Sequence, residues 1–294
     1  MGSIPRIEGL IGKVRGSSPL VHHLTNLVTM NDCANATLAI GASPVMSASE
    51  LEAPELAALA SALVINMGTP DDAQVRSMLA AARVARERCI PIVFDPVGAG
   101  ATEYRRKLSV RLLDQCGATI VKGNAAEIAF LAGLSSSQRG VDSLEGAEAI
   151  ERTARAAVSV ARRASCVVVA TGAIDVVADS GGAWTIEGGC PELGRICGSG
   201  CMEASVAASL AAVASSSGAR SPGTCSSGAL EAAISASLVF KLAGEAALSS
   251  PSAARGLSSF RWAFMDALSA IGDEALDAAT LSSGSGGRYR YVRL

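Results

Sequence analysis

The residues with the clearest chemical potential stand in one short run, Cys197, Gly198, Ser199, Gly200 and Cys201, where an apolar, alanine-rich segment begins. Two glycines around a serine allow a tight turn and a close approach of a ligand to the backbone, because neither glycine carries a Cβ. We expect a strand before this turn and a helix after it. The first N–H groups of such a helix have no intrahelical partner and lie at the positive end of its dipole. The run therefore predicts an anion site, most simply for a phosphate.

Cys201 would lie at the mouth of that helix. The dipole there favours the thiolate, so we expect its pKa to lie nearer neutrality than that of an ordinary thiol. A thiol in this position could accept the proton of an alcohol bound beside a phosphate. The alternative is that the glycines only end a strand and that the cysteine is a small buried residue.

The rest of the chain alternates between apolar runs and helical patterns. This alternation predicts an α/β fold with a mostly parallel sheet and helices on both faces. The expected parallel strands span residues 19–25, 43–47, 62–68, 91–96, 118–124 and 166–171, and DVVADS and AWTIEG are expected to form a two-strand ribbon. The expected helices include 30–40, 54–62, a long one capped by Asp71 or Asp72, 103–115, one from 125, 143–163, 204–214, 228–248 and 260–271.

Polar residues follow several of these strands. Ligands of such sheets lie beyond the carboxyl ends of the strands, so Asn66, Asp95, Lys122, Asn124 and Thr171 should share one rim, with Glu127 just after Asn124. Two carboxylates and an amide suit Mg²⁺, which takes oxygen ligands and is usually completed by waters and substrate phosphates. Each acid also has a purely structural interpretation, Asp95 as a turn residue before a proline and Glu127 as a first-turn acid of a helix.

Composition excludes several classes of function. A net charge of −2 and 3% aromatic residues argue against nucleic-acid binding. No run is long enough to span a membrane and no signal core is visible, so a cytoplasmic protein is expected. The eight cysteines form no CxxC pair and have no histidine near them, which disfavours zinc.

Neither the dinucleotide fingerprint nor a GxxxxGK[ST] loop occurs, which disfavours Rossmann and P-loop enzymes. No composition break marks a linker, so residues 1–294 are expected to form one domain with a flexible tail over 281–294.

Several long motifs resemble the hydroxyethylthiazole kinase family of the ribokinase-like superfamily. The resemblance is carried by PLVHHLTNLVTMNDCANATLAIGASPVM, VINMGT, IVFDPVGAGATEYR, VKGNAAEI, ATGAIDVVAD and ICGSGCMEAS. It implies a three-layer ribokinase-like fold and phosphoryl transfer from ATP to the alcohol of 4-methyl-5-(2-hydroxyethyl)thiazole, with Mg²⁺, in thiamine biosynthesis. It also implies a homotrimer with active sites between subunits.

The resemblance assigns expected roles to individual positions. Met46 and Gly198 are similar to substrate-contact positions, and Asn26, in the turn after the first strand, joins them as a candidate. Lys122 and Thr171 match ATP-contact positions, with Asn124 beside them, and Asp95 and Glu127 resemble the metal-associated acids. Cys201 stands where many relatives in the superfamily have a catalytic aspartate, behind the Gly198–Gly200 turn.

Three departures from the family pattern are visible. Lys122 replaces the usual arginine, which removes a bidentate grip on phosphate but keeps the charge. The turn reads CGSGC where TGTGC is usual, and GLSSF replaces a GPGSF-like loop. Two other functions stay open: a ribokinase-like kinase for another small alcohol, such as hydroxymethylpyrimidine, and a nucleotide-binding protein without turnover.

Overall fold

A computed structural model of the chain describes residues 7, 9–134, 146–214, 228–253, 256–281 and 288–292. The expected helix start at 143–145 lies outside these residues, as does Cys225. No helix in the described part is both long and apolar enough to cross a membrane.

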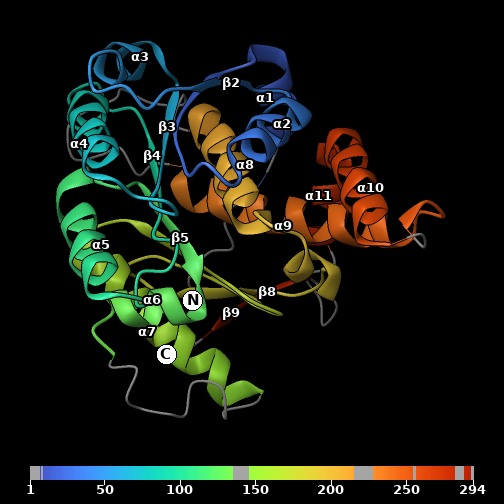
Figure 1. Cartoon of the computed structure of the whole chain (residues 1–294). Helices are drawn as coiled ribbons and strands as arrows, with labels where there is room; N and C mark the ends of the chain where they lie inside the picture. Colours follow the sequence, from blue (N-terminus) through green and yellow to red (C-terminus); the bar gives the residue numbers. More distant parts are fainter. Residues whose placement is uncertain are drawn as a thin grey trace.

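One nine-stranded sheet runs through the molecule in the order β2-β1-β3-β4-β5-β6-β7-β8-β9 (Figure 1). The neighbours from β2 to β6 are parallel, and β7, β8 and β9 add antiparallel pairs at one edge. The strands are β1 (Leu20–Leu24), β2 (Ser43–Met46), β3 (Ala62–Asn66), β4 (Ile92–Asp95), β5 (Ile120–Asn124), β6 (Val167–Thr171), β7 (Asp175–Ala178), β8 (Ala183–Ile186) and β9 (Tyr289–Val292). The mostly parallel α/β sheet and the two-strand ribbon of the sequence prediction are confirmed.

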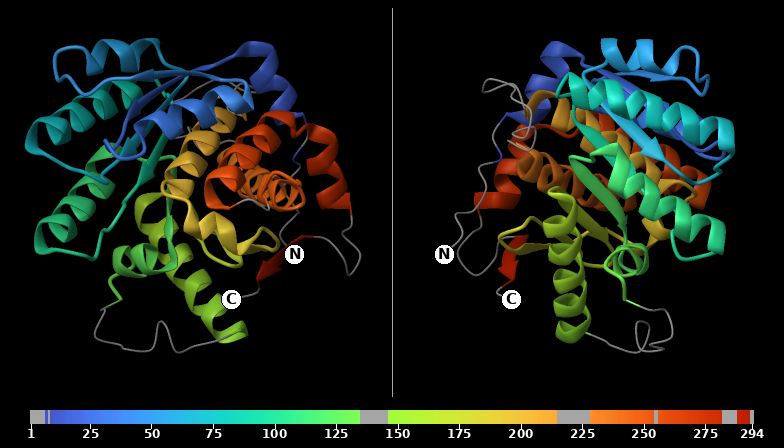
Figure 2. Two further views of the ribbon diagram at one scale, coloured as in Figure 1. Left: turned by 45° about the vertical axis from the view of Figure 1, so that its right-hand side comes forward. Right: turned by 90° about the vertical axis from the view of Figure 1, so that its left-hand side faces the viewer.

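Helices cover both faces of the sheet (Figure 2). One face carries α1 (Leu10–Ser17), α2 (Met30–Ile40), α8 (Ser199–Ala214), α9 (Ala229–Leu248), α10 (Leu257–Ala270) and α11 (Asp273–Leu281). The other carries α3 (Ala53–Leu59), α4 (Asp72–Glu87), α5 (Glu103–Cys116), α6 (Ala125–Leu131) and α7 (Ala147–Ala164). The two apolar cores, one on each side, make this the expected three-layer arrangement.

Local signals set many of the helix boundaries. Asp71 caps α4 by accepting a hydrogen bond from the Gln74 N–H, as the sequence suggested. Gly41 ends α2 with a φ of 102°, a left-handed conformation that glycine adopts without strain.

The sequence prediction was wrong at two places. The segment before the glycine turn is a 3₁₀ helix, η1 (Pro191–Arg195), and not a strand; Pro191 at its start supplies the fixed φ of a first helical turn. Within the range expected to be a flexible tail, residues 289–292 form β9, which pairs with β8 along its whole length.

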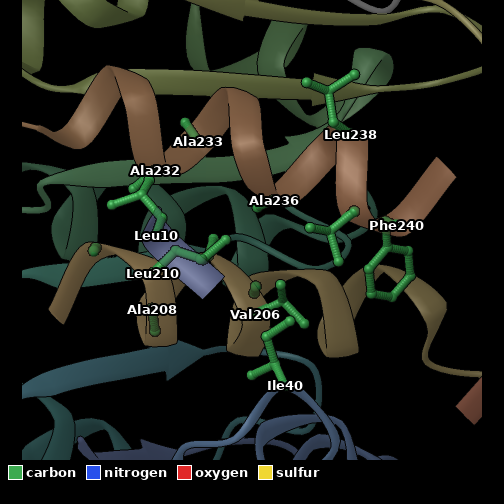
Figure 3. Close-up of a cluster of buried hydrophobic side chains, with 14 of the residues drawn as sticks. Leu10, Ile40, Val206, Ala208, Leu210, Ala232, Ala233, Ala236, Leu238 and Phe240 are labelled. Atoms are coloured by element: carbon green, nitrogen blue, oxygen red, sulfur yellow. The ribbon is translucent and has the colours of Figure 1, made fainter. Parts of the chain in front are cut away.

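Helix α8 is the centre of the fold. It is buried without interruption from Cys201 to Ala214, as expected of a helix that is apolar on all sides. Its small side chains let α9 pack closely against it, with Val206, Leu210, Ala232 and Ala236 in the shared cluster (Figure 3). The start of α8, which carries the glycine turn, is therefore held by a rigid packed layer.

Candidate active site

The carboxyl ends of four neighbouring strands bring the expected polar residues to one rim. Asn66 at the end of β3 pairs in register with Asp95 at the end of β4. Asn124 at the end of β5 pairs in the same way with Thr171 at the end of β6. These registers confirm that the polar strand ends share one edge of the sheet.

The glycine turn delivers the start of α8 to this rim. Gly198 has a φ of 81°, and a Cβ on it would lie 2.5 Å from Cγ2 of Thr29. Both its conformation and its space therefore require glycine. The backbone N–H groups of Gly200 and Cys201 make no hydrogen bond of ordinary geometry with any residue that the structure describes. They are donors that an anion can use.

Two asparagines join the turn to the strands. Asn66 donates from Nδ2 to Oδ2 of Asp95 at 2.8 Å and lies 3.2 Å from Sγ of Cys201. Asn26 donates from Nδ2 to Oδ1 of Asn66 at 3.0 Å, and its own Oδ1 accepts from both the backbone and the hydroxyl of Thr29. The side chain of Asn26 thus holds the loop between β1 and α2 against the end of β3 and the start of α8.

The expected low pKa of Cys201 is wrong. Burial of the thiol and the nearby charge of Asp95 raise its pKa, against the effect expected from the helix dipole. Burial likewise raises the pKa of Asp95 to about 7, although the Lys122 charge opposes this shift. Of this pair, the carboxyl of Asp95 therefore has the pKa nearer neutrality, beside a thiol whose pKa is raised.

Lys122 lies beneath the first turn of α8. A Cβ on Gly200 would be 2.6 Å from Nζ of Lys122, so the ammonium lies directly against the glycine. Its closest carboxylate contact given by the structure is Oε2 of Glu203 at 3.9 Å, longer than a hydrogen bond. The charges of Asp95 and Glu203 outweigh the effect of burial and raise the pKa of Lys122, so it remains a cation.

A cavity of about 520 Å³ opens beside the turn. Its walls include Thr171, Ser199, Gly200 and Glu203, with Lys241 at its inner end. The volume lies within the range of ordinary small-molecule sites. Thr171 is half-buried there and donates from its hydroxyl to the carbonyl of Gly123.

Glu127 and Asn124 form the N-terminal cap of α6. Asn124 accepts from the Glu127 N–H at 2.9 Å, and Oε2 of Glu127 accepts from the Asn124 N–H at 2.8 Å. Oε1 of Glu127 accepts from the N–H of Gly98, in the loop that follows Asp95. Glu127 therefore has the structural role that the sequence left open, that of a first-turn acid of a helix. Its carboxylate also connects the start of α6 to the loop that follows Asp95.

The carboxylates of Asp95 and Glu127 fit a cation most of whose ligands are water molecules and phosphates. The described residues contain no group of three His, Cys, Asp or Glu side chains arranged to hold a metal. Asp95 and Glu127 lie close enough for the Glu127 charge to raise the pKa of Asp95. Two oxygen donors of this kind match a magnesium ion completed by waters and phosphates.

Met46 lies apart from this centre. It ends β2, an edge strand, where it pairs with His23 and is half-buried. The cavity is not lined by Met46, Asn26 or Cys201 in the part of the chain that the structure describes. Of the expected ATP contacts, Thr171 lines the cavity, whereas Lys122 and Asn124 do not; Nζ of Lys122 lies against Gly200, which is part of the cavity wall.

Sequence reasoning missed three charged residues of the cavity, Asp175, Glu203 and Lys241. All three are buried. A signal existed, because Glu203 and Lys241 interrupt the otherwise apolar interiors of α8 and α9. A charge in such a position is expected only where a partner or a ligand compensates it.

Comparisons with known proteins agree with this geometry. The model of the hydroxyethylthiazole kinase family matches residues 11–274. The hydroxyethylthiazole kinase of Methanoculleus marisnigri is 48% identical over 213 residues, which cover 72% of this chain and 75% of that protein.

Solved structures show the same relationship. The hydroxyethylthiazole kinase protein of Pyrococcus horikoshii superposes with a TM-score of 0.81 at 35% identity, over 98% of this chain and 99% of that one. A ribokinase-like superfamily protein from Enterococcus faecalis superposes with a TM-score of 0.52 at 12% identity, covering 85% and 86% of the two chains, which shows a shared fold.

Proposed function

The chain belongs to the hydroxyethylthiazole kinase family, and from this premise we propose how its site transfers phosphate from ATP to the hydroxyl of 4-methyl-5-(2-hydroxyethyl)thiazole. The activity places the enzyme in thiamine biosynthesis. The observation that carries the proposal is the start of α8, where amides available to an anion, an ammonium and a buried thiol meet at one glycine turn.

In the proposed arrangement, ATP occupies the cavity and its terminal phosphate lies at the turn. The N–H groups of Gly200 and Cys201 and the ammonium of Lys122 meet the negative charge of the transferring group. Preorganised donors of this kind contribute about 2.7 to 4 kcal/mol each in comparable anion holes. Thr171, and Asn124 next to it across the β5–β6 pair, would contact the nucleotide from the strand ends.

The alcohol approaches from the opposite side of the turn, past Gly198, Asn26 and Met46. We infer that its proton leaves late in the transfer, to an oxygen of the transferred phosphoryl group, because the transition state of phosphoryl transfer is loose. The protonated thiol, held by Asn66 and Asn26, then positions the hydroxyl and is not itself a preformed thiolate.

A kinase of this family uses ATP with a divalent metal, and we propose Mg²⁺ held by Asp95 and Glu127. When bound, the ion neutralises phosphate charge. The role of the protein is to supply two carboxylates that are already linked through the Gly98 loop and the cap of α6.

We propose that a homotrimer completes the acceptor side of the site. Leu27 and Val28, next to the Thr29 that touches Gly198, are 72% and 66% exposed. Leu38 on α2 and Trp262 on α10 are also exposed, on two helices that pack together and share the Arg261–Asp32 ion pair. Apolar surface at the rim of a site is typical of an interface.

The direct test incubates the protein with the thiazole alcohol, ATP and Mg²⁺ and searches for the thiazole phosphate by mass spectrometry. A parallel panel of other primary alcohols, including hydroxymethylpyrimidine, measures selectivity. Preferential phosphorylation of another alcohol would contradict the proposed acceptor, and ATP binding without any product would contradict the kinase. Light scattering on the purified protein tests the trimer, since a monomeric mass would exclude it.

We also propose a cytoplasmic location. The described cysteines are all free thiols, as expected in a reducing compartment. Localisation of a tagged full-length chain tests this directly.

A further inference from the structure

The inner end of the cavity holds a lysine that the proposed reaction does not use. Lys241 belongs to α9 and is 5% exposed, although burying an ammonium is costly unless its charge is compensated. Its Nζ lies 3.3 Å from Oδ1 of Asp175. It also donates to three backbone carbonyls, those of Ala173 and Gly188 at 3.2 Å and that of Gly172 at 3.5 Å.

These acceptors belong to two different walls of the cavity. Gly172 and Ala173 form the turn after β6, whereas Gly188 follows β8. Asp175 strengthens the first wall, because its Oδ1 also accepts from the Gly172 N–H at 2.9 Å. Lys241 therefore connects one turn to the other through a single charged atom.

The second wall is already attached to α9 by other contacts. The N–H of Gly189 donates to Oε1 of Glu245 at 2.7 Å, and Sγ of Cys190 lies 3.4 Å from the carbonyl of Gly244. Gly188 and Gly189 have φ values of 105° and 86°, conformations that glycine adopts without intrinsic restraint. The Gly188–Gly189 segment therefore needs hydrogen-bond partners to keep one conformation. The turn at Gly172 and Ala173 needs such partners too.

Hydrogen-bond capacity distinguishes Lys241, which lines the cavity, from Lys122, which lies against Gly200 in the cavity wall. An ammonium has three N–H donors. Those of Lys241 are used by the carbonyls and the carboxylate, so none is left for a phosphate. Nζ of Lys122 has no comparable partner among the described residues and remains available to a ligand.

We propose that Lys241 is a positioning residue of the nucleotide site, a tethered cation that holds the two glycine-containing walls at the separation ATP requires. It acts through backbone carbonyls and does not touch the phosphates. This inference rests on the proposed function only in taking the cavity as the ATP site.

The test compares Lys241→Met, which keeps the length of the side chain and removes its charge, with Lys107→Met. Lys107 is an exposed control on α5 whose side chain is 76% accessible. Binding of ATP with Mg²⁺ is measured by calorimetry without acceptor, and KM values are measured for both substrates. Lys241→Met should weaken ATP binding about tenfold or more, because three carbonyls lose their donor. The KM for the thiazole should change less than about twofold, a separation between substrates that this positioning role predicts.

A second measurement distinguishes positioning from simple stabilisation. In Lys241→Ala, methylammonium should restore ATP affinity, and sodium chloride at the same concentration should not, because only the amine can donate to the carbonyls. Unchanged ATP affinity in folded Lys241→Met, with or without a lower Tm, would overturn the inference. If that variant does not fold, Lys241→Gln replaces it, with the same expected loss and the same overturning result.

The wild-type protein separates this inference from the proposed function. ATP binding without phosphorylated thiazole would reject the kinase reaction but leave the role of Lys241 to be decided by the variants. Failure of the wild type to bind ATP would reject both.

Discussion

Replacing Gly200 by alanine tests whether Lys122 and the first turn of α8 form one phosphate site. The new methyl group would lie 2.6 Å from Nζ of Lys122, so the ammonium must move by about 0.8 Å to reach an ordinary contact of 3.4 Å. The backbone of Gly200 is helical and its φ is not positive, so alanine should favour the helix by about 0.5–1 kcal/mol. The substitution therefore separates ligand binding from folding.

We expect the Gly200→Ala enzyme to have an unchanged or higher Tm and a KM for ATP raised about tenfold. Hydrogen bonds to charged groups contribute about 1.5–3 kcal/mol, and losing the lower value corresponds to about a tenfold change. Steady-state kinetics with ATP as the varied substrate and a thermal melt measure the two effects.

Gly16→Ala is a matched control. Gly16 lies in α1 and has no positive φ, and no atom lies within 4 Å of the position that a methyl group on it would take. Alanine should therefore stabilise the protein slightly and leave the kinetics unchanged. A wild-type KM for ATP in stable Gly200→Ala would show that Lys122 does not serve the phosphates from its present position. A raised KM in Gly16→Ala would show that the assay reports a general helix effect.

Substitutions at three further positions test the other parts of the site. Cys201→Ser should lower kcat strongly with little change in the KM for ATP, whereas Cys201→Asp should retain activity, because a carboxylate at this position can accept the proton of the alcohol; unchanged turnover of the serine variant would remove the thiol from the mechanism. Gly198→Ala should destabilise the protein by more than about 1 kcal/mol and reduce activity, because φ is 81° and the methyl group would lie 2.5 Å from Thr29; an unaltered melt would contradict this. Burial raises the pKa of Glu203 to about 7, so unfolding releases its proton and its contribution to stability falls as pH rises from about 4.5 to about 7. Glu203→Gln should flatten that slope in melts across this range, and an identical slope would reject the assignment.

The rim of polar residues was predictable because each of its members follows a strand within a few residues. An apolar run that ends in Asp95 or Asn124 shows where a strand ends from local sequence alone. Parallel pairing of the strands then places these ends at one edge of the sheet. The helix that begins at the glycine turn was predictable from its continuous apolar, alanine-rich run; a helical pattern was expected from Gly200 onward, and α8 starts at Ser199.

The electrostatics of the site could not be predicted in this way. The dipole of α8 is a local property and suggested a thiolate at Cys201. Burial and the charge of Asp95 reach the thiol through space, from a residue far away in the sequence, and they reverse the direction of the shift. The pairs Lys122–Glu203 and Lys241–Asp175 likewise depend on how α8 and α9 lie on the sheet.

The tail was mispredicted for a related reason. Residues 289–292 form a run of only four residues, YRYV, after the glycine- and serine-rich stretch SSGSGG, and the exposed edge of β8 gives them a partner. A strand that forms by adding to an existing edge needs little hydrophobic pattern of its own.

The first turn of α8 also explains how one helix can serve two substrates. Residues two positions apart on a helix point in nearly opposite directions. Cys201 contacts Asn66 beside Asp95, and Glu203 faces Lys122 and Ser237. Around the helix, Gly200 points between the directions of Cys201 and Glu203, and it has no side chain. The Lys122 ammonium occupies the space that a side chain at Gly200 would take. In the proposed arrangement, the turn thus keeps the thiol beside the alcohol apart from the cation beside the phosphate, and the buried remainder of α8 fixes the distance between them.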